Sequence, residues 1–595
     1  MFRRISLLAL LLFLAATAMM EAPADKPGEN SFCRILPADS FLYVEVKDIG
    51  GTLQRKDSLA VVKFFADEEI KAFIDELGKA IAGKTGTNPS DYVNDFTGAV
   101  SLFGEGLKGE MCITIPPLPE GKPKGLAFLA HYDPAKIGNV KEAIEDLALL
   151  FSGGEDIGLT FDAKDVNGIQ ATVAGVADKP VKIVYAVVKD TLVFTTSEDL
   201  FTTYAGYLTK PPEKTLADNP DFLKIYEQAA ARDLFWYYDN LQLQKVMEPF
   251  LQMAEQMGAV TPLGGLLEIS RKYSRLARGM GCGMSFEGDD VLENIYTTVN
   301  PEADKDALEF VRKWGELTCS MKTARFIPKD AIFYMASAAP FDSIYDMLEG
   351  LLPDEFKDKL MEIENQLMLS IKDDVIPAFG QEMGMYFTMQ FIAPSFLVAV
   401  EVKDNDTIQT LLTSLKQVAP SLTEEEIAGV KVLRLAIPNI GIQAGIALHD
   451  GFLIFGTMNA LRFAITGKGE NITANEGYQD ILKMTKGAQN VSGIIYLDTK
   501  VVMGLLYDNF IRLAQAQLAQ MEDFDPATIP SRDAFVDYMR PMGGYFTYEG
   551  GVSHTAFKGM FPFLSLSVIN PLIYGLGVIQ MPQMPQDQPG GEDIF

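Results

Sequence analysis

The stretch from Gly78 to Thr85 carries the most specific chemical pattern in this chain of 595 residues. It fits G-x-x-x-x-G-K-[ST], whose backbone N–H groups cradle phosphates where a strand leads into the loop and a helix follows. Here the order is reversed, because residues 67–82 have apolar residues at helical spacing and run into the motif as a helix. The sequence therefore predicts a helix C-terminus at Gly83-Lys84-Thr85, near the negative end of the helix dipole, and no ATP binding.

Histidine chemistry is limited to three residues, His131, His449 and His554. None has a metal-ligand spacing such as H-x-x-x-H, and the chain lacks the G-x-S-x-G pattern of a hydrolase nucleophile. His131 precedes Asp133 by two residues, so a triad with a distant serine stays open. On this basis we assign no catalytic, cofactor-binding or metal-binding residue.

Several carboxylates recur at matching places in two parts of the chain: Asp239 and Asp498, and Glu287 and Glu549. A residue present at both places is explained by turns and strand ends of a shared fold. A paired-carboxylate site would need two of these groups close together. Two further acidic runs fit solvated helix ends and lack the ligand spacing of a calcium loop: residues 373–374 and 424–426.

Four cysteines are spaced without a C-x-x-C or zinc-ligand pattern: Cys33, Cys112, Cys282 and Cys319. Their even number allows disulfides in an oxidising compartment. Buried free thiols explain them equally well, so their pairing stays open.

Methionine is abundant, at 26 residues, and gathers on two expected helices. Met247, Met253 and Met257 follow one helix, and Met361 and Met368 follow the other. Flexible methionine side chains suit an adaptable groove for a lipid or a peptide. Ordinary core packing accounts for the same spacing and is the favoured explanation.

The N-terminus has the form of a secretory signal peptide. Arg3 and Arg4 precede an uncharged, mostly apolar run at residues 5–16, and Ala16-Thr17-Ala18 offers a cleavage site of small residues. No cysteine follows that site directly, so a lipoprotein anchor is not expected. The sequence predicts a protein exported to the periplasm, the cell envelope or the extracellular space.

The composition is that of an acidic globular protein, with 48% apolar and 22% charged residues. The formal net charge is −29, and removal of Arg3 and Arg4 with the signal makes it −29 − 2 = −31. So acidic a surface repels nucleic acid and anionic lipid head groups. We therefore expect no nucleic-acid partner.

The chain repeats itself in order. Leu36-Pro37-Ala38-Asp39 recurs as Ile327-Pro328-Lys329-Asp330, at an offset of 328 − 37 = 291. Each motif leads into an apolar strand, and further matches follow in the same order at smaller offsets. They are residues 126–129 and 397–400, residues 192–194 and 453–455, Asn219 and Asn475, Tyr237 and Tyr496, and residues 285–288 and 547–550. The order predicts two diverged tandem copies of one unit.

The same elements are expected in both copies. Each copy opens with a strand, at residues 41–47 or 332–338, and amphipathic helices follow. Hairpins turn at Asn167-Gly168, at Lys189-Asp190 and at Asp450-Gly451, whereas the Gly/Pro-rich stretch 104–125 fits a loop. Strands that return as hairpins predict an α+β fold, with two tandem copies of a unit with a largely antiparallel sheet and helices packed on one face.

The expected organisation divides the chain into seven parts. They are a signal peptide (1–18), an exposed N-terminal segment (19–33), repeat copy 1 (34–300), a linker helix (301–326), repeat copy 2 (327–565), an apolar C-terminal segment (566–581) and a disordered tail (582–595).

Three motifs resemble those of a known family: the Leu36-Pro37-Ala38-Asp39 strand opening, the helix start Asn219-Pro220-Asp221-Phe222, and the closing hairpin at Phe286-Glu287-Gly288. The chain resembles the exported bacterial proteins grouped as domain of unknown function 3352. The resemblance covers nearly all of the mature chain and implies an envelope or secreted location with a repeated architecture. It implies no activity and no cofactor. Copy 2 departs from the pattern, with Glu476-Gly477 in place of Pro220-Asp221.

The C-terminal stretch 559–581 contains no charged residue and is long enough to cross a bilayer. Pro562 and Pro571 interrupt a helix there, and the flanking charges give the wrong orientation for a C-terminal anchor. We expect this segment to fold against the domain, with membrane attachment through 559–581 as the alternative.

These observations lead to a non-enzymatic binding or scaffold protein of the cell envelope, with an apolar ligand or a protein partner. An extracytoplasmic hydrolase with an unrecognised site is one alternative. A structural envelope component anchored by its C-terminus is the other.

Overall fold

The fold is described by a computed structural model. It describes residues 27–28, 31–48, 58–85, 98–118, 124–152, 158–176, 182–229, 232–256, 274–352, 354–390, 393–419, 421–437, 442–511, 515 and 524–566. The expected signal peptide and the expected disordered tail lie outside these residues. So does the apolar segment 566–581, apart from Leu566.

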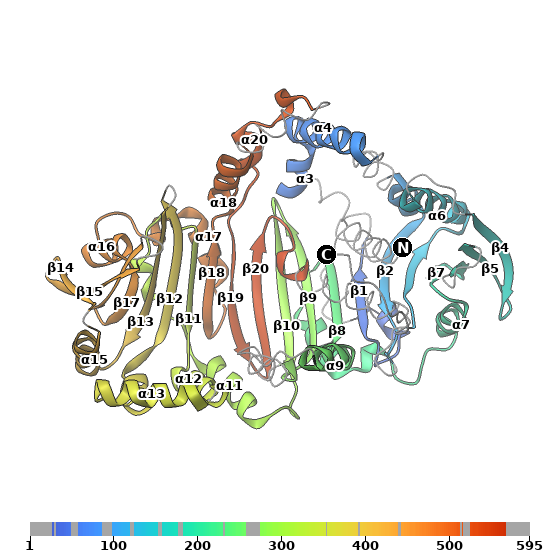
Figure 1. Cartoon of the computed structure of the whole chain (residues 1–595). Coiled ribbons are helices and arrows are strands. Elements are labelled where there is room, and N and C mark those ends of the chain that lie inside the picture. The colour runs from blue at the N-terminus through green and yellow to red at the C-terminus, as the bar shows by residue number, and fades with distance from the viewer. Residues whose placement is uncertain are drawn as a thin grey trace, which may run out of the picture.

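The strands of the described residues form one continuous sheet in which all neighbours are antiparallel (Figure 1). From one edge to the other they are β14 (Thr423–Ile427), β15 (Val430–Ile437), β16 (Ile442–His449), β17 (Phe452–Thr457), β13 (Ala393–Val402), β12 (Phe379–Gln390), β11 (Phe333–Ala338), β18 (Val491–Leu497), β19 (Met542–Glu549), β20 (Val552–Gly559), β10 (Asp290–Val299), β9 (Ala277–Glu287), β8 (Leu234–Asp239), β1 (Leu42–Val46), β2 (Leu107–Ile115), β3 (Ala127–Tyr132), β7 (Thr191–Thr195), β6 (Lys182–Val188), β5 (Ile169–Val176) and β4 (Leu159–Val166).

The pairing pattern of β1–β10, the first half, is the same as that of β11–β20, the second half. Tyr43 of β1 lies opposite Tyr237 of β8, and Tyr334 of β11 lies opposite Tyr496 of β18. The two halves meet where β10 pairs with β20 at the centre of the sheet. Residues at the same place in this pattern are called corresponding below. Tandem copies of one unit would account for the match, and that origin stays a prediction.

Helices cover one face of the sheet in both halves, and we call it the helical face. In the first half α7 (Glu198–Tyr207) and α8 (Pro220–Gln228) share a core with Tyr43 and Leu129. In the second half α16 (Met458–Thr466) and α17 (Glu476–Met484) share one with Tyr334 and Leu397. The predicted α+β fold with a largely antiparallel sheet is confirmed.

The opposite face, here called the open face, differs between the halves. In the first half its residues are buried, with Val44, Ile113 and Trp236 among them. Helices α6 (Ile137–Ser152) and α9 (Asn240–Gln256) pack against these side chains through residues such as Val140 and Val246. The prediction that helices pack on one face of the sheet is therefore wrong for the first half, which has helices on both faces. In the second half the open-face side chains of β11 and β12 are partly buried or exposed.

Paired asparagines fix the helical face in both halves. The Asn219 side chain caps α8 and donates a 2.8 Å hydrogen bond to the carbonyl of Ala38, just before β1. Asn475 caps α17 and donates a 2.9 Å bond to the carbonyl of Lys329, just before β11. Each asparagine thus ties a helix start to the opening turn of its half.

Most expected turns and helix ends are confirmed. Hairpins turn at Asn167-Gly168, Lys189-Asp190 and Asp450-Gly451. The expected linker contains α11 (Lys305–Glu316), capped by Asp304. Helix α4 (Glu68–Thr85) runs to the end of the G-x-x-x-x-G-K-T motif, so the predicted helix C-terminus there is confirmed.

Three further predictions are wrong. Residues 104–125 are not one loop, because β2 crosses them and pairs with β1 and β3; Gly and Pro only flank its apolar core. Residues 424–426 are not a helix end but lie in β14, where Glu424 and Glu425 pair with lysines and arginines. The N-terminal segment is not exposed throughout, since Ser31, Phe32 and Cys33 are buried.

Candidate functional site

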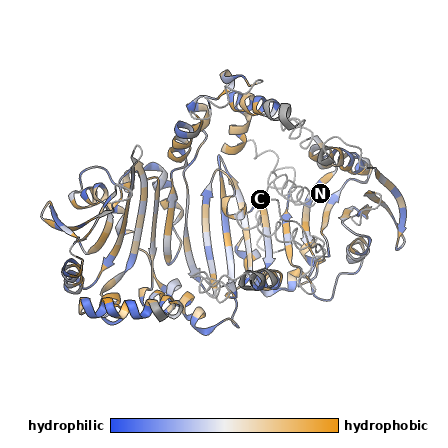
Figure 2. Cartoon of the chain, in the orientation of Figure 1, coloured by the Kyte–Doolittle hydropathy of each residue, from blue (hydrophilic) through white to orange (hydrophobic). Residues whose placement is uncertain are grey.

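An apolar cavity of about 800 Å³ lies on the open face, close to the junction of the halves. Its floor is made by strands β9–β11 and β18–β20, and it is bounded by α3 (Ala60–Ala66), α18 (Thr499–Leu506) and residues 560–564. All lining side chains are apolar except those of Thr499 and Thr555. The hydropathy colouring shows the apolar residues of α3 and α18 (Figure 2).

Helix α3 belongs to the first half and packs on both halves. It follows β1 in the chain, yet Phe64 stacks edge-on against Phe535 and Tyr538, with ring centroids 5.8 and 6.3 Å apart. Lys63 lies 2.5 Å from the carboxylate of Asp289, which also binds Arg540 at 2.6 Å. These contacts hold α3 in place as one wall of the cavity.

Two aromatic side chains lie where the cavity meets solvent. Phe65 of α3 and Phe563 both line it, yet they are 56% and 47% exposed. Apolar side chains that are exposed beside an apolar hollow mark its mouth, because a ligand that enters would cover them.

A C-terminal strap, residues 560–566, forms another wall. The carboxylate of Glu293, fully buried on β10, accepts hydrogen bonds from the backbone N–H groups of Leu564 (3.0 Å) and Ser565 (2.7 Å). The indole N–H of Trp236 donates a 2.9 Å bond to the Ser565 hydroxyl. Leu564 and Leu566 pack against the core of the first half. The prediction that the residues after β20 fold against the domain is confirmed as far as residue 566.

Comparison of corresponding residues explains why the cavity extends from the junction over the second half and not over the first. Trp236 and Tyr238 flank Tyr237 on β8, whereas Ile495 and Leu497 flank the corresponding tyrosine on β18. The two large rings and the strap fill the open face of the first half. The smaller aliphatic side chains of β18 line the cavity instead.

The strap is held by a group that the second half lacks. Glu287 and Glu549 close equivalent hairpins, and Glu293 and Thr555 each lie six residues further along (293 − 287 = 6 and 555 − 549 = 6). Thr555 is therefore the residue of the second half that corresponds to Glu293. Thr555 lines the cavity. The hydroxyl of the other polar lining residue, Thr499, already donates a hydrogen bond to the carbonyl of Arg540.

A buried charged cluster lies on the helical face of the first half. Glu45 and Arg232 are 1% and 4% exposed and lie 3.4 Å apart. Tyr226 donates a 2.9 Å hydrogen bond to Glu45, and the Arg232 guanidinium lies 3.8 Å from the centre of the Tyr226 ring. Because the opposite charges pair with each other inside the fold, we assign the cluster to the stability of the fold, although Nε of Arg232 has no hydrogen-bond partner.

Glu110 belongs to the same cluster. It accepts hydrogen bonds from the Phe32 backbone N–H (2.9 Å) and the Ser31 hydroxyl (3.0 Å). Burial, and secondarily the charge of Glu45, raises the pKa of Glu110 to about 8. The corresponding carboxylate, Glu382, accepts bonds from the Thr323 backbone N–H (2.7 Å) and the Ser320 hydroxyl (3.0 Å). Both carboxylates therefore fix the turn before the first strand of their half.

The three histidines do not come together. His131 stacks on Phe32, His449 lies beside Phe326, and His554 stacks on Tyr296 with ring centroids 4.5 Å apart. Burial lowers the pKa of His554 to about 4.

Asp133, the carboxylate that the triad hypothesis placed beside His131, binds other groups. Asp133 pairs with Lys108 at 2.9 Å and accepts a hydrogen bond from the Ala135 backbone N–H. No hydrogen bond joins His131 to Asp133. The geometry therefore does not support a triad built on His131 and Asp133.

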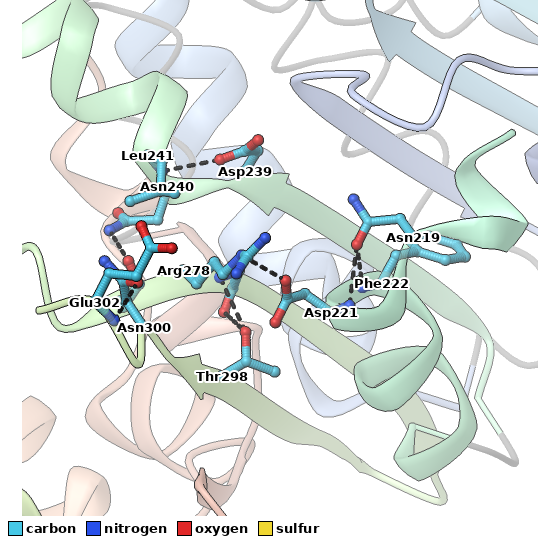
Figure 3. A network of polar contacts seen from close by, with 12 residues as sticks. Asn219, Asp221, Phe222, Asp239, Asn240, Leu241, Arg278, Thr298, Asn300 and Glu302 are labelled. Atoms are coloured by element: carbon cyan, nitrogen blue, oxygen red, sulfur yellow. Dashed lines mark hydrogen bonds and ion pairs between the residues drawn. The ribbon is translucent and has the colours of Figure 1, made fainter. Parts of the chain in front are cut away.

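The carboxylates that recur in both halves lie at helix starts and hairpin turns. Asp239 and Asp498 cap α9 and α18 through hydrogen bonds to the backbone N–H groups of Leu241 (2.9 Å) and Val501 (3.1 Å). Figure 3 shows Asp239 beside a polar network in which Arg278 binds Asp221 at 2.8 Å. Glu287 and Glu549 lie at the closing hairpins.

The described residues contain neither a cluster of metal ligands nor a disulfide. No group of three or more metal-binding side chains is present among them. Their four cysteines, Cys33, Cys112, Cys282 and Cys319, are buried and free.

The methionine-rich helices do not line the cavity. Met247 on α9 is 40% exposed, and Met361 on α13 (Asp354–Leu367) is 53% exposed. Met503, Met539, Met542 and Met560 supply methionine to the cavity instead. The sequence interpretation missed these residues because they come from separate elements. The signal available was the contrast between Trp236 and Ile495 beside the matched tyrosines.

Comparisons with known proteins give no assignment. No family model matches the chain, and no curated protein matches it. Among solved structures, two crystal forms of TP0453 match with a TM-score of 0.24. They are 9% and 8% identical and cover 47% and 51% of this chain and 83% and 90% of the other. A likeness of this size carries no argument. Across the part of the chain that the structure describes, no helix has the length and apolar character to cross a membrane.

Proposed function

We propose that the protein is an exported, non-enzymatic binding protein of the cell envelope that holds an apolar ligand in the cavity beneath α3. The observation that supports the proposal is the cavity itself. Its volume of about 800 Å³ lies within the range of ligand pockets, roughly 300–1,000 Å³. Its lining offers almost no polar group.

The binding energy comes from removal of apolar surface from water, at about 25 cal/mol per Å². Core side chains fill the corresponding space in the first half, as folding normally requires. A cavity left open to solvent and lined by Phe333, Leu497 and Phe557 leaves apolar surface that a ligand would bury. Phe65 and Phe563 at the mouth would be covered when a ligand enters.

The test uses the first half as the template for a filled site. Ile495→Trp introduces the residue that the first half has at the corresponding position, and it fills the cavity from β18. Binding of the fluorescent probe N-phenyl-1-naphthylamine should weaken at least ten-fold, which is about 1.4 kcal/mol. Leu435→Trp adds the same ring at a 39% exposed site on β15, away from the cavity, and should leave binding unchanged.

Native mass spectrometry of the protein purified from its own host gives an independent readout. A co-purifying apolar molecule should be present on the unaltered chain and lost from Ile495→Trp. The proposal fails if probe binding is the same in the unaltered chain and in both tryptophan variants.

A further inference from the structure

We infer that the ligand is a lipid with two acyl chains, one in the cavity and one along a row of phenylalanines on the open face. This inference rests on the proposed function and names its ligand class. It is carried by two features: the absence of peptide-binding groups in the cavity, and an apolar surface that continues from it.

The first half shows which groups bind a peptide segment on the open face of this sheet. The strap is a bound segment of polypeptide, and its backbone N–H groups at Leu564 and Ser565 need the Glu293 carboxylate. Its serine hydroxyl accepts from Trp236. A peptide segment that is buried here therefore needs acceptors for its N–H groups as well as apolar contacts.

The second half lacks both groups. Thr555 replaces the carboxylate, and Ile495 replaces the indole. The Thr499 hydroxyl already bonds to a carbonyl. A peptide in this cavity would leave backbone N–H groups without acceptors, whereas a hydrocarbon chain has no such groups to satisfy.

The apolar surface does not end at the cavity. Phe333 lines the cavity and lies opposite Phe387 on the neighbouring strand, and Phe387 lies opposite Phe396 on the next. Phe396 contacts Phe455 of β17, with ring centroids 5.8 Å apart. These four residues form the phenylalanine row, which crosses from β11 to β17 over three strand spacings, about 14 Å.

The phenylalanine row is partly open to solvent. Phe387 and Phe455 are 38% and 39% exposed, although the same face of the first half is buried under helices. Met385 and Met389 on β12 lie two residues to either side of Phe387 and are only partly buried. Flexible methionines beside stacked rings adapt to a chain of variable shape. Because the row begins at a residue of the cavity lining, one ligand with two chains can occupy both.

The experiment offers two ligands of different class. Purified protein is incubated with vesicles of 1-palmitoyl-2-oleoyl-phosphatidylcholine, whose head group carries no net charge and avoids repulsion by the acidic surface. A parallel sample receives a peptide with the sequence of residues 560–566. After separation, native mass spectrometry measures what is bound. One lipid per chain and no bound peptide is the expected result.

Two variants test the two parts of the site. Thr555→Glu introduces the carboxylate of the first half and should lower lipid capture at least ten-fold, while Thr555→Val, which keeps the shape, should not lower it. Phe387→Ser should weaken binding of the two-chain lipid at least five-fold and leave binding of lysophosphatidylcholine, which has one chain, unchanged. Circular dichroism confirms that each variant is folded.

The outcomes separate this inference from the proposed function. If the peptide binds, the lipid does not, and Ile495→Trp abolishes peptide binding, the inference is wrong and the proposed function stands. If Phe387→Ser weakens both lipids equally or neither, the second-chain site is wrong. If lipid, peptide and N-phenyl-1-naphthylamine all fail to bind, the proposed function is wrong as well.

Discussion

Glu293 and Ser565 are 2.7 Å apart, carboxylate oxygen to backbone nitrogen, and this bond fastens the last described residues of the chain to the centre of the sheet. Residue 293 is fully buried on β10. The bond therefore joins the strap to the strand that pairs the first half with the second.

Replacement of Glu293 by threonine, the corresponding residue of the second half, should release the strap. A hydrogen bond to a charged group contributes about 1.5–3 kcal/mol, so the backbone amides of Leu564 and Ser565 should exchange at least ten-fold faster. Hydrogen exchange with mass spectrometry measures this. Thr297→Ser, on the same strand, is the control; equal protection in both variants would refute the role of Glu293.

Arg232→Val should be strongly destabilising on its own. It leaves Glu45 buried without its cation, a change that costs about 3–5 kcal/mol. Counted from the matched tyrosines, the second half has Ala336 (334 + 2) where the first has Glu45 (43 + 2), and Val491 (496 − 5) where the first has Arg232 (237 − 5); Ala336 and Val491 are both buried. The double variant Glu45→Ala/Arg232→Val should therefore recover most of the loss. Urea denaturation measures the free energies of unfolding, and a double variant no more stable than the single one would contradict this account.

Asn219→Ala and Asn475→Ala should cost similar amounts. Each substitution removes a helix cap and a hydrogen bond to the turn before the first strand of that half. The loss should lower the free energy of unfolding by about 1–2 kcal/mol. The sites lie in separate halves, so the two losses should add. Thermal and urea denaturation of the single and double variants test this. A large loss for one asparagine and none for the other would mean that the two caps do not act alike.

The sequence predicted local structure better than the site. Turns at Asn167-Gly168 and Asp450-Gly451, and the cap at Asn219, follow from short-range rules and are confirmed. Strand β2 was missed because the glycines and prolines around it dominate a short window. The cavity was missed because its walls come from α3, α18, six strands and the strap, which only the β10–β20 pairing and the packing of α3 across the halves bring together.

Glu110 should make stability depend on pH. Its folded pKa is raised to about 8, above the value of about 4.3 expected in the unfolded chain. The neutral form is favoured in the fold, so its stabilising effect is complete below about pH 4 and is lost as the pH rises to about 8. Glu110→Gln should remove this part of the pH dependence.

Urea denaturation at several pH values between 5 and 8 measures the effect of Glu110. The free energy of unfolding of the unaltered chain should fall more steeply with pH than that of Glu110→Gln. Glu287→Gln removes an exposed carboxylate and serves as the control. Parallel curves for the unaltered chain and Glu110→Gln would show that Glu110 does not titrate in this range.

Removal of the residues after Lys558 should destabilise the fold. A chain ending at Lys558 loses Leu564, Leu566 and the Ser565 bonds, and it uncovers Trp236 and Glu293. Loss of the partners of a buried charge costs about 3–5 kcal/mol, so this version should unfold at lower denaturant concentration. A chain ending at Met581 retains the strap and is the matched control.

Fractionation of the full-length protein tests the membrane alternative. Carbonate washing should release it from membranes, and retention of the full-length chain beside a soluble version ending at Lys558 would establish the anchor instead.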